Sequence, residues 1–200
     1  MSSPEPPATL AAVALGSNLG DCRATLEGAL AALDATPGLR VLRRSSWYRS
    51  APVGPPQPDY LNGCALLEVS LAPEALLDRL QAIESRFGRV RAERWGPRTL
   101  DLDLILFGET VLDSERLQIP HPRLYERAFV LVPLAEIAPD WIDPLTGRRV
   151  ADLAGDLSDA AGLLRLAEGE SEGESNGPAA AARLPGQSAA KAPAGPGASV

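Results

Sequence analysis

Residues 100–107 (LDLDLILF) constrain the fold most, because two aspartates alternate with leucines before a run of four apolar residues. Side chains two apart in a strand point to the same face, so Asp101 and Asp103 would share one face while the leucines enter a core. Two carboxylates this close repel each other, and a nearby cation removes that cost. Magnesium suits them because it binds oxygen ligands and takes the remainder from phosphates and water. Taken alone, such a pair is more often an exposed acidic pair on an edge strand, so its neighbours decide the interpretation.

The segment immediately before the aspartates is rich in arginine. A short stretch whose only acid is Glu93 contains Arg86, Arg89, Arg91, Arg94 and Arg98. Gly96-Pro97 predicts a turn, which lets the arginines and the carboxylates converge. Guanidinium groups bind phosphate oxygens through paired hydrogen bonds. Cations beside metal-binding carboxylates are what a polyphosphate–Mg²⁺ complex requires, so the sequence predicts a site of that kind.

The remaining elements follow from apolar periodicity and turn residues. Strands are expected at 10–15, 41–49, 60–69, 99–107 and 111–117, and helices after residue 18, from Pro73 to Gly88 and at 126–136. Asn18 is expected to cap the first helix, with Asp21 near the positive end of the helix dipole. This order predicts an α+β fold, namely a ferredoxin-like sandwich in which helices pack on a mostly antiparallel sheet.

Composition divides the chain into three parts. Residues 1–9, rich in proline and serine, predict a flexible leader, and residues 10–165 predict one folded domain. Residues 166–200 are acidic and rich in alanine, glycine and proline. Such a tail buries too little apolar surface to offset its ordering entropy, so it is expected to be disordered.

Charge and motifs exclude several classes of function. A net charge of −7 argues against binding to nucleic acid or an anionic membrane, and the apolar runs are too short to span a bilayer. Cys22 and Cys64 are too few for a disulfide scaffold or a thiolate metal site. Neither a P-loop nor a G-x-G-x-x-G motif is present. A cytoplasmic monomer is therefore expected.

Three further polar residues are candidates for the same site. Gln81 and Glu84 lie three apart on the second predicted helix, where they either reach the site or belong to a solvated face. His121, the only histidine, stands between two prolines that fix its backbone. A lone histidine is more often structural than catalytic, although near phosphate it could donate a hydrogen bond.

Several separated motifs, in order, carry a family resemblance. They are residues 14–20 (ALGSNLG), 48–52 (YRSAP), 58–62 (PDYLN), 94–105 (RWGPRTLDLDLI) and 120–122 (PHP). Together they resemble the 6-hydroxymethyl-7,8-dihydropterin pyrophosphokinase (HPPK) family of folate biosynthesis, over about residues 11–150. The resemblance implies that residues 10–165 form a catalytic domain. It also implies transfer of the β,γ-diphosphate of ATP to the hydroxymethyl group of the dihydropterin, which gives the pterin diphosphate and AMP.

The resemblance also implies roles for individual residues. Two Mg²⁺ ions would be held by Asp101 and Asp103, and transition-state contacts would come from Arg89 and Arg98. ATP, the co-substrate, would be bound by Gln81, Glu84, Arg91, Arg94, Trp95, Ile105, Arg116, His121 and Arg127. The pterin would be bound by Ser50, Val53, Tyr60, Asn62 and Phe129, with two rings enclosing it and Asn62 reading its edge. Which of Arg89 and Arg91 takes which phosphate role stays open.

An RNA-binding module of ferredoxin-like fold, using the arginine segment, is the alternative. Such modules display paired aromatic side chains on the sheet. Aromatic residues make up only 4% of this chain and are scattered, and the net charge has the wrong sign for RNA. The expected partners are therefore the two small-molecule substrates, with no nucleic acid and no membrane.

Overall fold

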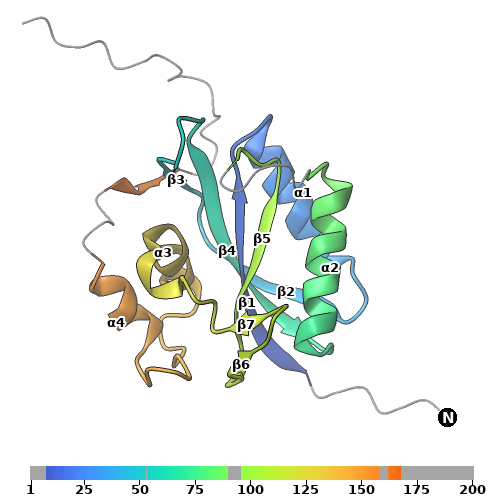
Figure 1. Cartoon of the computed structure of the whole chain (residues 1–200), viewed down its shortest axis with the longest axis vertical. Coiled ribbons are helices and arrows are strands. Elements are labelled where there is room, and N and C mark those ends of the chain that lie inside the picture. Colours follow the sequence, from blue (N-terminus) through green and yellow to red (C-terminus); the bar gives the residue numbers. More distant parts are fainter. Residues whose placement is uncertain (1–7, 53, 90–95, 158–161, 168–200) are drawn as a thin grey trace, which may run out of the picture.

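A computed structural model describes residues 8–52, 54–89, 96–157 and 162–167 of the chain (Figure 1). A central sheet carries helices on both faces, with α1 (Cys22–Asp34) and α2 (Pro73–Arg86) on one side and α3 (Ala128–Ile137) and α4 (Val150–Gly155) on the other. The α+β class and the antiparallel sheet follow the prediction. No helix in the described ranges is long and apolar enough to cross a membrane.

The main sheet is antiparallel at every pairing between its strands. Its order is β5-β1-β4-β3-β8, and β2 also pairs with β4. The strands are β1 (Thr9–Ser17), β2 (Leu39–Arg44), β3 (Tyr48–Ser50), β4 (Tyr60–Val69), β5 (Asp101–Phe107) and β8 (Leu164–Arg165). The hairpin of β6 (Leu112–Asp113) and β7 (Gln118–Ile119), and a 3-10 turn at Leu124–Glu126, link the sheet to α3.

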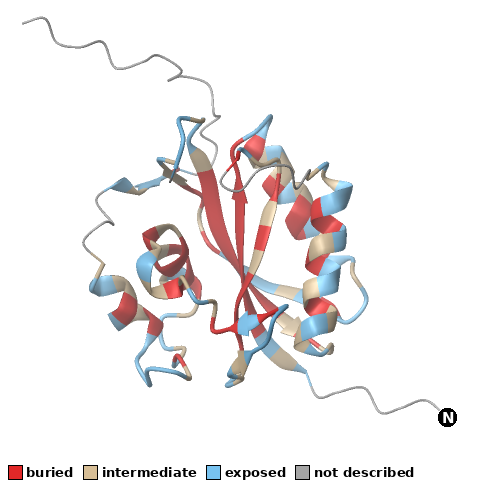
Figure 2. Cartoon of the chain, in the orientation of Figure 1, coloured by how far each residue is buried: buried red, intermediate tan, exposed pale blue. Residues whose placement is uncertain are grey.

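Each face of the sheet has its own apolar core, which Figure 2 shows as buried residues along the central strands. The core beneath α1 and α2 includes Leu26, Leu33, Leu67, Leu80 and Leu102, and the core beneath α3 and α4 includes Ala12, Leu66, Ile105, Leu131 and Leu134. Because both faces are covered, β4 reads as an almost continuous buried run rather than an alternating one.

The phase predicted for residues 100–104 is confirmed. Leu100, Leu102 and Leu104 are buried in the core beneath α1 and α2. Asp101 and Asp103 are only partly buried and face the opposite side, toward α3. The alternation ends where the pairing of β5 with β1 shifts register, beyond Leu104, so that Ile105 and Leu106 both join the other core.

Two predicted strands are wrong in extent. The strand expected at 41–49 is broken between Arg44 and Tyr48. There the backbone N–H of Ser45 still donates to the carbonyl of Cys64 in β4, while the backbone N–H of Ser46 donates to the carboxylate of Glu136. The strand expected at 111–117 is replaced by the β6–β7 hairpin. Ser114 closes its turn, donating from its backbone N–H and its hydroxyl to the carbonyl of Leu117.

The predicted cap of the first helix is also wrong. Asp21 is the N-cap of α1, and its Oδ1 accepts a hydrogen bond of 2.9 Å from the backbone N–H of Ala24. Asn18 is instead 3% exposed and lies before the helix, where it contacts two other segments. The residue nearest the helix start takes the capping role because a cap reaches only two or three residues forward.

Candidate functional site

A cavity opens on the α3 side of the sheet, where strands β1, β3, β4 and β5 meet the start of α3. Its lining consists of Ala14, Leu15, Gly16, Ser50, Ala51, Tyr60, Asn62, Arg98, Asp101, Asp103, Arg127, Phe129 and Val130. Gly16 is part of the lining, where an added Cβ would make ordinary contacts of 3.5 Å with Asn62 Oδ1 and 3.9 Å with Asp101 Cβ. The cavity thus brings together acidic, basic and aromatic side chains that are far apart in the sequence.

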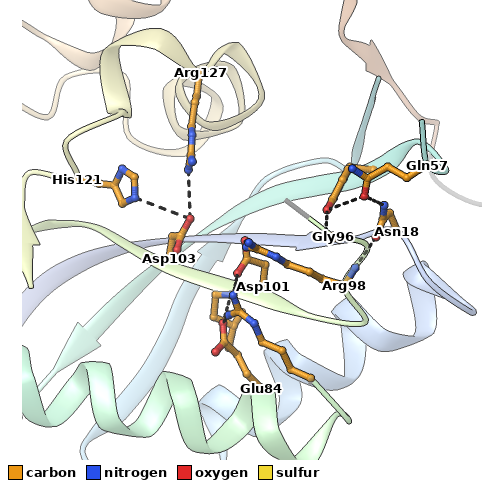
Figure 3. Close-up of polar contacts among 12 residues, drawn as sticks. Asn18, Gln57, Glu84, Gly96, Arg98, Asp101, Asp103, His121 and Arg127 are labelled. Atoms are coloured by element: carbon orange, nitrogen blue, oxygen red, sulfur yellow. Dashed lines mark hydrogen bonds and ion pairs between the residues drawn. The ribbon is translucent and has the colours of Figure 1, made fainter. Parts of the chain in front are cut away.

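Asp101 pairs with two arginines, Arg89 and Arg98, the second of which is labelled in Figure 3. Its Oδ1 is 2.7 Å from Nη2 of Arg89, and its Oδ2 accepts a hydrogen bond of 2.6 Å from Nη1 of Arg98. Burial and the neighbouring Asp103 raise the pKa of Asp101 above its usual value, although both arginines oppose that shift. The two aspartates therefore repel each other in a poorly solvated place, where a cation is favoured.

Glu84 supports this arrangement from α2 and is 2% exposed. Its Oε1 accepts a hydrogen bond of 2.8 Å from the backbone N–H of Leu102 and also pairs with Nη1 of Arg89. Since β5 ends the strand order of the main sheet, Glu84 satisfies a backbone donor on an open edge. It therefore belongs to a buried network that holds Arg89 toward Asp101, and not to a solvated helix face.

Asp103 is surrounded by the loop before α3. Its Oδ2 is 3.2 Å from Nη1 of Arg127 and 4.0 Å from Nε2 of His121. Burial lowers the pKa of His121 below its usual value, against the attraction of Asp103. The backbone N–H of His121 donates to the carbonyl of Ile105 at 3.0 Å, which fixes the loop to β5. The Arg127 guanidinium also lies 5.6 Å from the centroid of the Phe129 ring.

The described residues expected to bind the pterin line the same cavity. They are Ser50, Tyr60, Asn62 and Phe129. Asn62 is 5% exposed, and its Nδ2 donates to Ser50 Oγ at 3.0 Å and to the carbonyl of Tyr48 at 3.3 Å. Burial raises the pKa of Tyr60, so its hydroxyl is a neutral donor. The structure therefore places these polar and aromatic side chains in the same cavity as Asp101 and Asp103.

Other expected site residues lie elsewhere. Arg116 pairs with Asp78 at 2.6 Å, with about 60% of each side chain exposed. Gln81 does not line the cavity, and its backbone carbonyl accepts a hydrogen bond from Ser85. Residues outside the described ranges are Val53, Arg91, Arg94 and Trp95.

Asn18, which the sequence interpretation assigned only to capping, holds together two segments next to the cavity. Its Nδ2 donates to Gln57 Oε1 at 3.0 Å and to the carbonyl of Pro58 at 3.2 Å, and its Oδ1 accepts from the backbone N–H of Arg98 at 2.7 Å (Figure 3). Asn18 therefore joins the loop before β4 to the segment before Asp101. Apolar periodicity does not identify a residue of this kind. Only its position directly after a buried strand indicates that it could contact other segments.

Replacing Asn18 with alanine should lower kcat/KM about tenfold, because it removes three partly buried hydrogen bonds, each worth about 1 kcal/mol, that hold two segments together. Steady-state rates of the diphosphate transfer that the resemblance implies measure the change. Asn18→Asp is the matched control, since it keeps the acceptor for Arg98 and loses the donors to Gln57 and Pro58. Unchanged rates in Asn18→Ala would show that the two segments are held by other contacts.

The residues present fit the magnesium that the sequence predicts. Asp101 and Asp103 present carboxylate oxygens on one face of β5 and line one cavity. In the described part of the chain, no group of three or more His, Cys, Asp or Glu side chains forms a complete protein metal site. Magnesium is commonly bound by one or two carboxylates, with water and substrate phosphates completing its shell.

Comparisons with known proteins agree with this reading of the cavity. Residues 12–139 match the family described as 7,8-dihydro-6-hydroxymethylpterin-pyrophosphokinase (HPPK). A 2-amino-4-hydroxy-6-hydroxymethyldihydropteridine pyrophosphokinase of Synechocystis sp. is 58% identical over 143 residues, covering 72% of this chain and 73% of the relative. The protein of the same name from Pseudomonas aeruginosa is 53% identical over 142 residues, covering 70% and 87%. These matches give no support to the RNA-binding alternative.

A solved structure shares the fold. The chain resembles Plasmodium falciparum HPPK-DHPS crystallised with pteroate, with a TM-score of 0.64 and 13% identity, over 82% of this chain and 47% of that one. The chain therefore spans about half the length of that protein. At this identity the likeness concerns the fold alone.

Proposed function

Because the chain belongs to the HPPK family, we propose that it transfers the β,γ-diphosphate of ATP to the hydroxymethyl group of 6-hydroxymethyl-7,8-dihydropterin and releases AMP. The observation that carries this proposal is the cavity itself. One space is lined by an aspartate pair, by Arg98 and Arg127, and by the group of Ser50, Asn62 and Phe129. Triphosphate chemistry and recognition of a flat, polar ring are thus supported at adjacent positions.

The aspartates and arginines account for the phosphate side of the reaction. Asp101 and Asp103 would hold two Mg²⁺ ions, which when bound neutralise triphosphate charge and orient its oxygens. Arg89, Arg98 and Arg127 supply cations beside the same carboxylates. Positioning and charge neutralisation provide most of the catalysis in phosphoryl-type transfer, so the proposal requires no general base.

The pterin side depends on shape and hydrogen bonding. We infer that the rings of Tyr60 and Phe129 border the pterin, because both line the cavity beside Asn62. Asn62 is fixed by its bonds to Ser50 and Tyr48, so a ligand would meet a rigid amide. If the pterin ring is oriented by this amide, its hydroxymethyl oxygen is positioned toward the phosphate side without rearrangement of the protein, which is the benefit of preorganisation.

The other assignments stay predictions. They comprise ATP contacts from Gln81, Arg91, Arg94, Trp95, Ile105, Arg116 and His121, a pterin contact from Val53, a flexible leader at 1–9 and a cytoplasmic monomer. The disordered tail predicted at 166–200 is wrong at its start, because Leu166 is buried and its backbone N–H donates to the carbonyl of Trp47, and it stays a prediction for 168–200. The contacts of Glu84 favour support of Arg89 over direct contact with ATP. The strand order β5-β1-β4-β2 supports the ferredoxin-like arrangement.

Nucleotide product analysis tests the proposal. With ATP, Mg²⁺ and the hydroxymethyl dihydropterin, the protein should form AMP and the pterin diphosphate in equal amounts. Omission of the pterin should abolish AMP formation, because no acceptor for the diphosphate remains. Chelation of Mg²⁺ with EDTA should abolish it as well, because the charge of the triphosphate is no longer neutralised. Separation of the nucleotides by chromatography gives the answer directly. Formation of ADP, or of no pterin-dependent product, would contradict the proposed reaction.

A further inference from the structure

The short strand β8 lies outside residues 12–139, the part of the chain that matches the family, and yet it extends the sheet beside the cavity. Arg165 and Leu164 pair with Tyr48 and Arg49 of β3, as the orange strand beside β3 in Figure 1 shows. The backbone N–H of Leu166 then donates to the carbonyl of Trp47 at 2.9 Å. The Leu166 side chain is 8% exposed and joins the core beneath α1 and α2, so this segment is packed and not merely adjacent.

Glu136, near the end of α3, connects this segment to β3. Its Oε1 accepts hydrogen bonds from Ser46 Oγ at 2.8 Å and from Arg165 Nη2 at 3.2 Å, and its Oε2 accepts from the Tyr48 hydroxyl at 2.9 Å. The backbone N–H of Ser46 lies within hydrogen-bond distance of both oxygens. Burial alone would raise the pKa of Glu136, but the hydrogen bonds from Ser46 and Tyr48 outweigh it and lower the pKa. Glu136 is thus an ionised acceptor at neutral pH.

The Glu136 cluster, which we define as Ser46, Tyr48, Glu136 and Arg165, contacts the residues that line the pterin side of the cavity through Tyr48. The Tyr48 carbonyl accepts from Asn62 Nδ2, which also donates to Ser50 Oγ. Ser50, two positions after Tyr48 on β3, lines the cavity from the sheet. Phe129 and Val130 line it from the first turn of α3. The cluster therefore joins the two elements, β3 and α3, whose separation sets the width of the cavity.

We propose that Glu136 and Arg165 are positioning residues that fix α3 against β3 and thereby set the affinity of the cavity for the pterin. This inference rests on the proposed function. Glu136 provides most of the effect, because it receives charge-assisted bonds from three other residues. Arg165 provides less, because its side chain is 63% exposed and exposed ion pairs contribute little.

Glu136→Ala should raise the KM for the pterin roughly tenfold and leave the KM for ATP within about twofold, whereas Arg165→Ala should raise the pterin KM about two- to threefold. Arg165→Lys, which keeps one charged donor, should restore most of the loss. The matched control is Arg149→Ala, an arginine on the surface that is about half exposed and paired with Asp152. This control should leave both constants unchanged.

Steady-state kinetics with each substrate varied in turn, together with thermal melting of every variant, distinguish the outcomes. A purely structural role would lower the melting temperature while both KM values stay unchanged, and that result would overturn the inference. An equal rise in both KM values would also overturn it. Wild-type protein that forms no AMP would refute the proposed function instead, so the two failures remain distinguishable.

Discussion

Replacing Asp101 and Asp103 together with asparagine should lower kcat/KM by about a thousandfold or more, because the change removes both carboxylates proposed to hold the metal. Asparagine preserves the shape of each side chain, so the cavity should keep its form. Arg98 and Arg127 would lose the carboxylates with which they pair, and Arg89 would keep only Glu84, so the positions of these arginines toward the phosphates would loosen. The loss therefore combines missing metal ligands with displaced cations.

The rate of AMP formation over a range of Mg²⁺ concentrations measures this loss. Asp113→Asn provides the control, since Asp113 is an exposed acid on β6 outside the cavity. That variant should retain wild-type rates and wild-type dependence on Mg²⁺. Near-normal turnover by the double variant would show that the metal assignment is incorrect, whatever happens to the rest of the proposal.

The second large effect concerns stability. Glu84→Ala should reduce the free energy of unfolding by about 3 kcal/mol, since it leaves the partly buried Arg89 with Asp101 alone and the Leu102 N–H without that acceptor. A typical domain has only about 5–15 kcal/mol of stability, so this is a substantial fraction. Catalysis should fall too, because Arg89 would no longer be held toward Asp101.

Chemical denaturation followed by circular dichroism measures the loss of stability. Glu84→Gln separates the two contributions, as an amide oxygen can still accept from Leu102 but brings no charge to Arg89. The control on the same helix is Glu74→Ala, an exposed residue in the first turn of α2, where the cost should stay below about 1 kcal/mol. A Glu84→Ala variant as stable as the Glu74→Ala variant would rule out the buried network as a stabilising feature.

The elements of the sheet and helices that could be predicted are those with strong periodic signals. The aspartates and leucines at 100–104 carry a period of two, and β5 has that phase. Pro73 and Gly88 mark the ends of α2, which spans Pro73–Arg86. In these stretches the local pattern and the tertiary packing agree, so a single sequence was sufficient.

Long-range contacts explain what could not be predicted. At the break between β2 and β3, Ser46 bonds to Glu136, which lies 90 residues later in the chain. The strand β8 is only two residues long and pairs with β3 across more than a hundred positions, so no local pattern marks it. The role of Asn18 likewise depends on Gln57 and Arg98. The motif at residues 14–20 includes Asn18 but does not indicate which residues it contacts.

Strands β1 and β4 pair with neighbours along both edges and have an apolar core on each face. Opening either strand would expose both cores at once, so such an opening costs nearly as much free energy as unfolding the whole domain. Gly16 and Asn62 belong to these strands and contribute to the floor of the cavity. The floor therefore cannot adapt to a ligand of another shape, and any conformational adjustment during turnover must come from the surrounding loops.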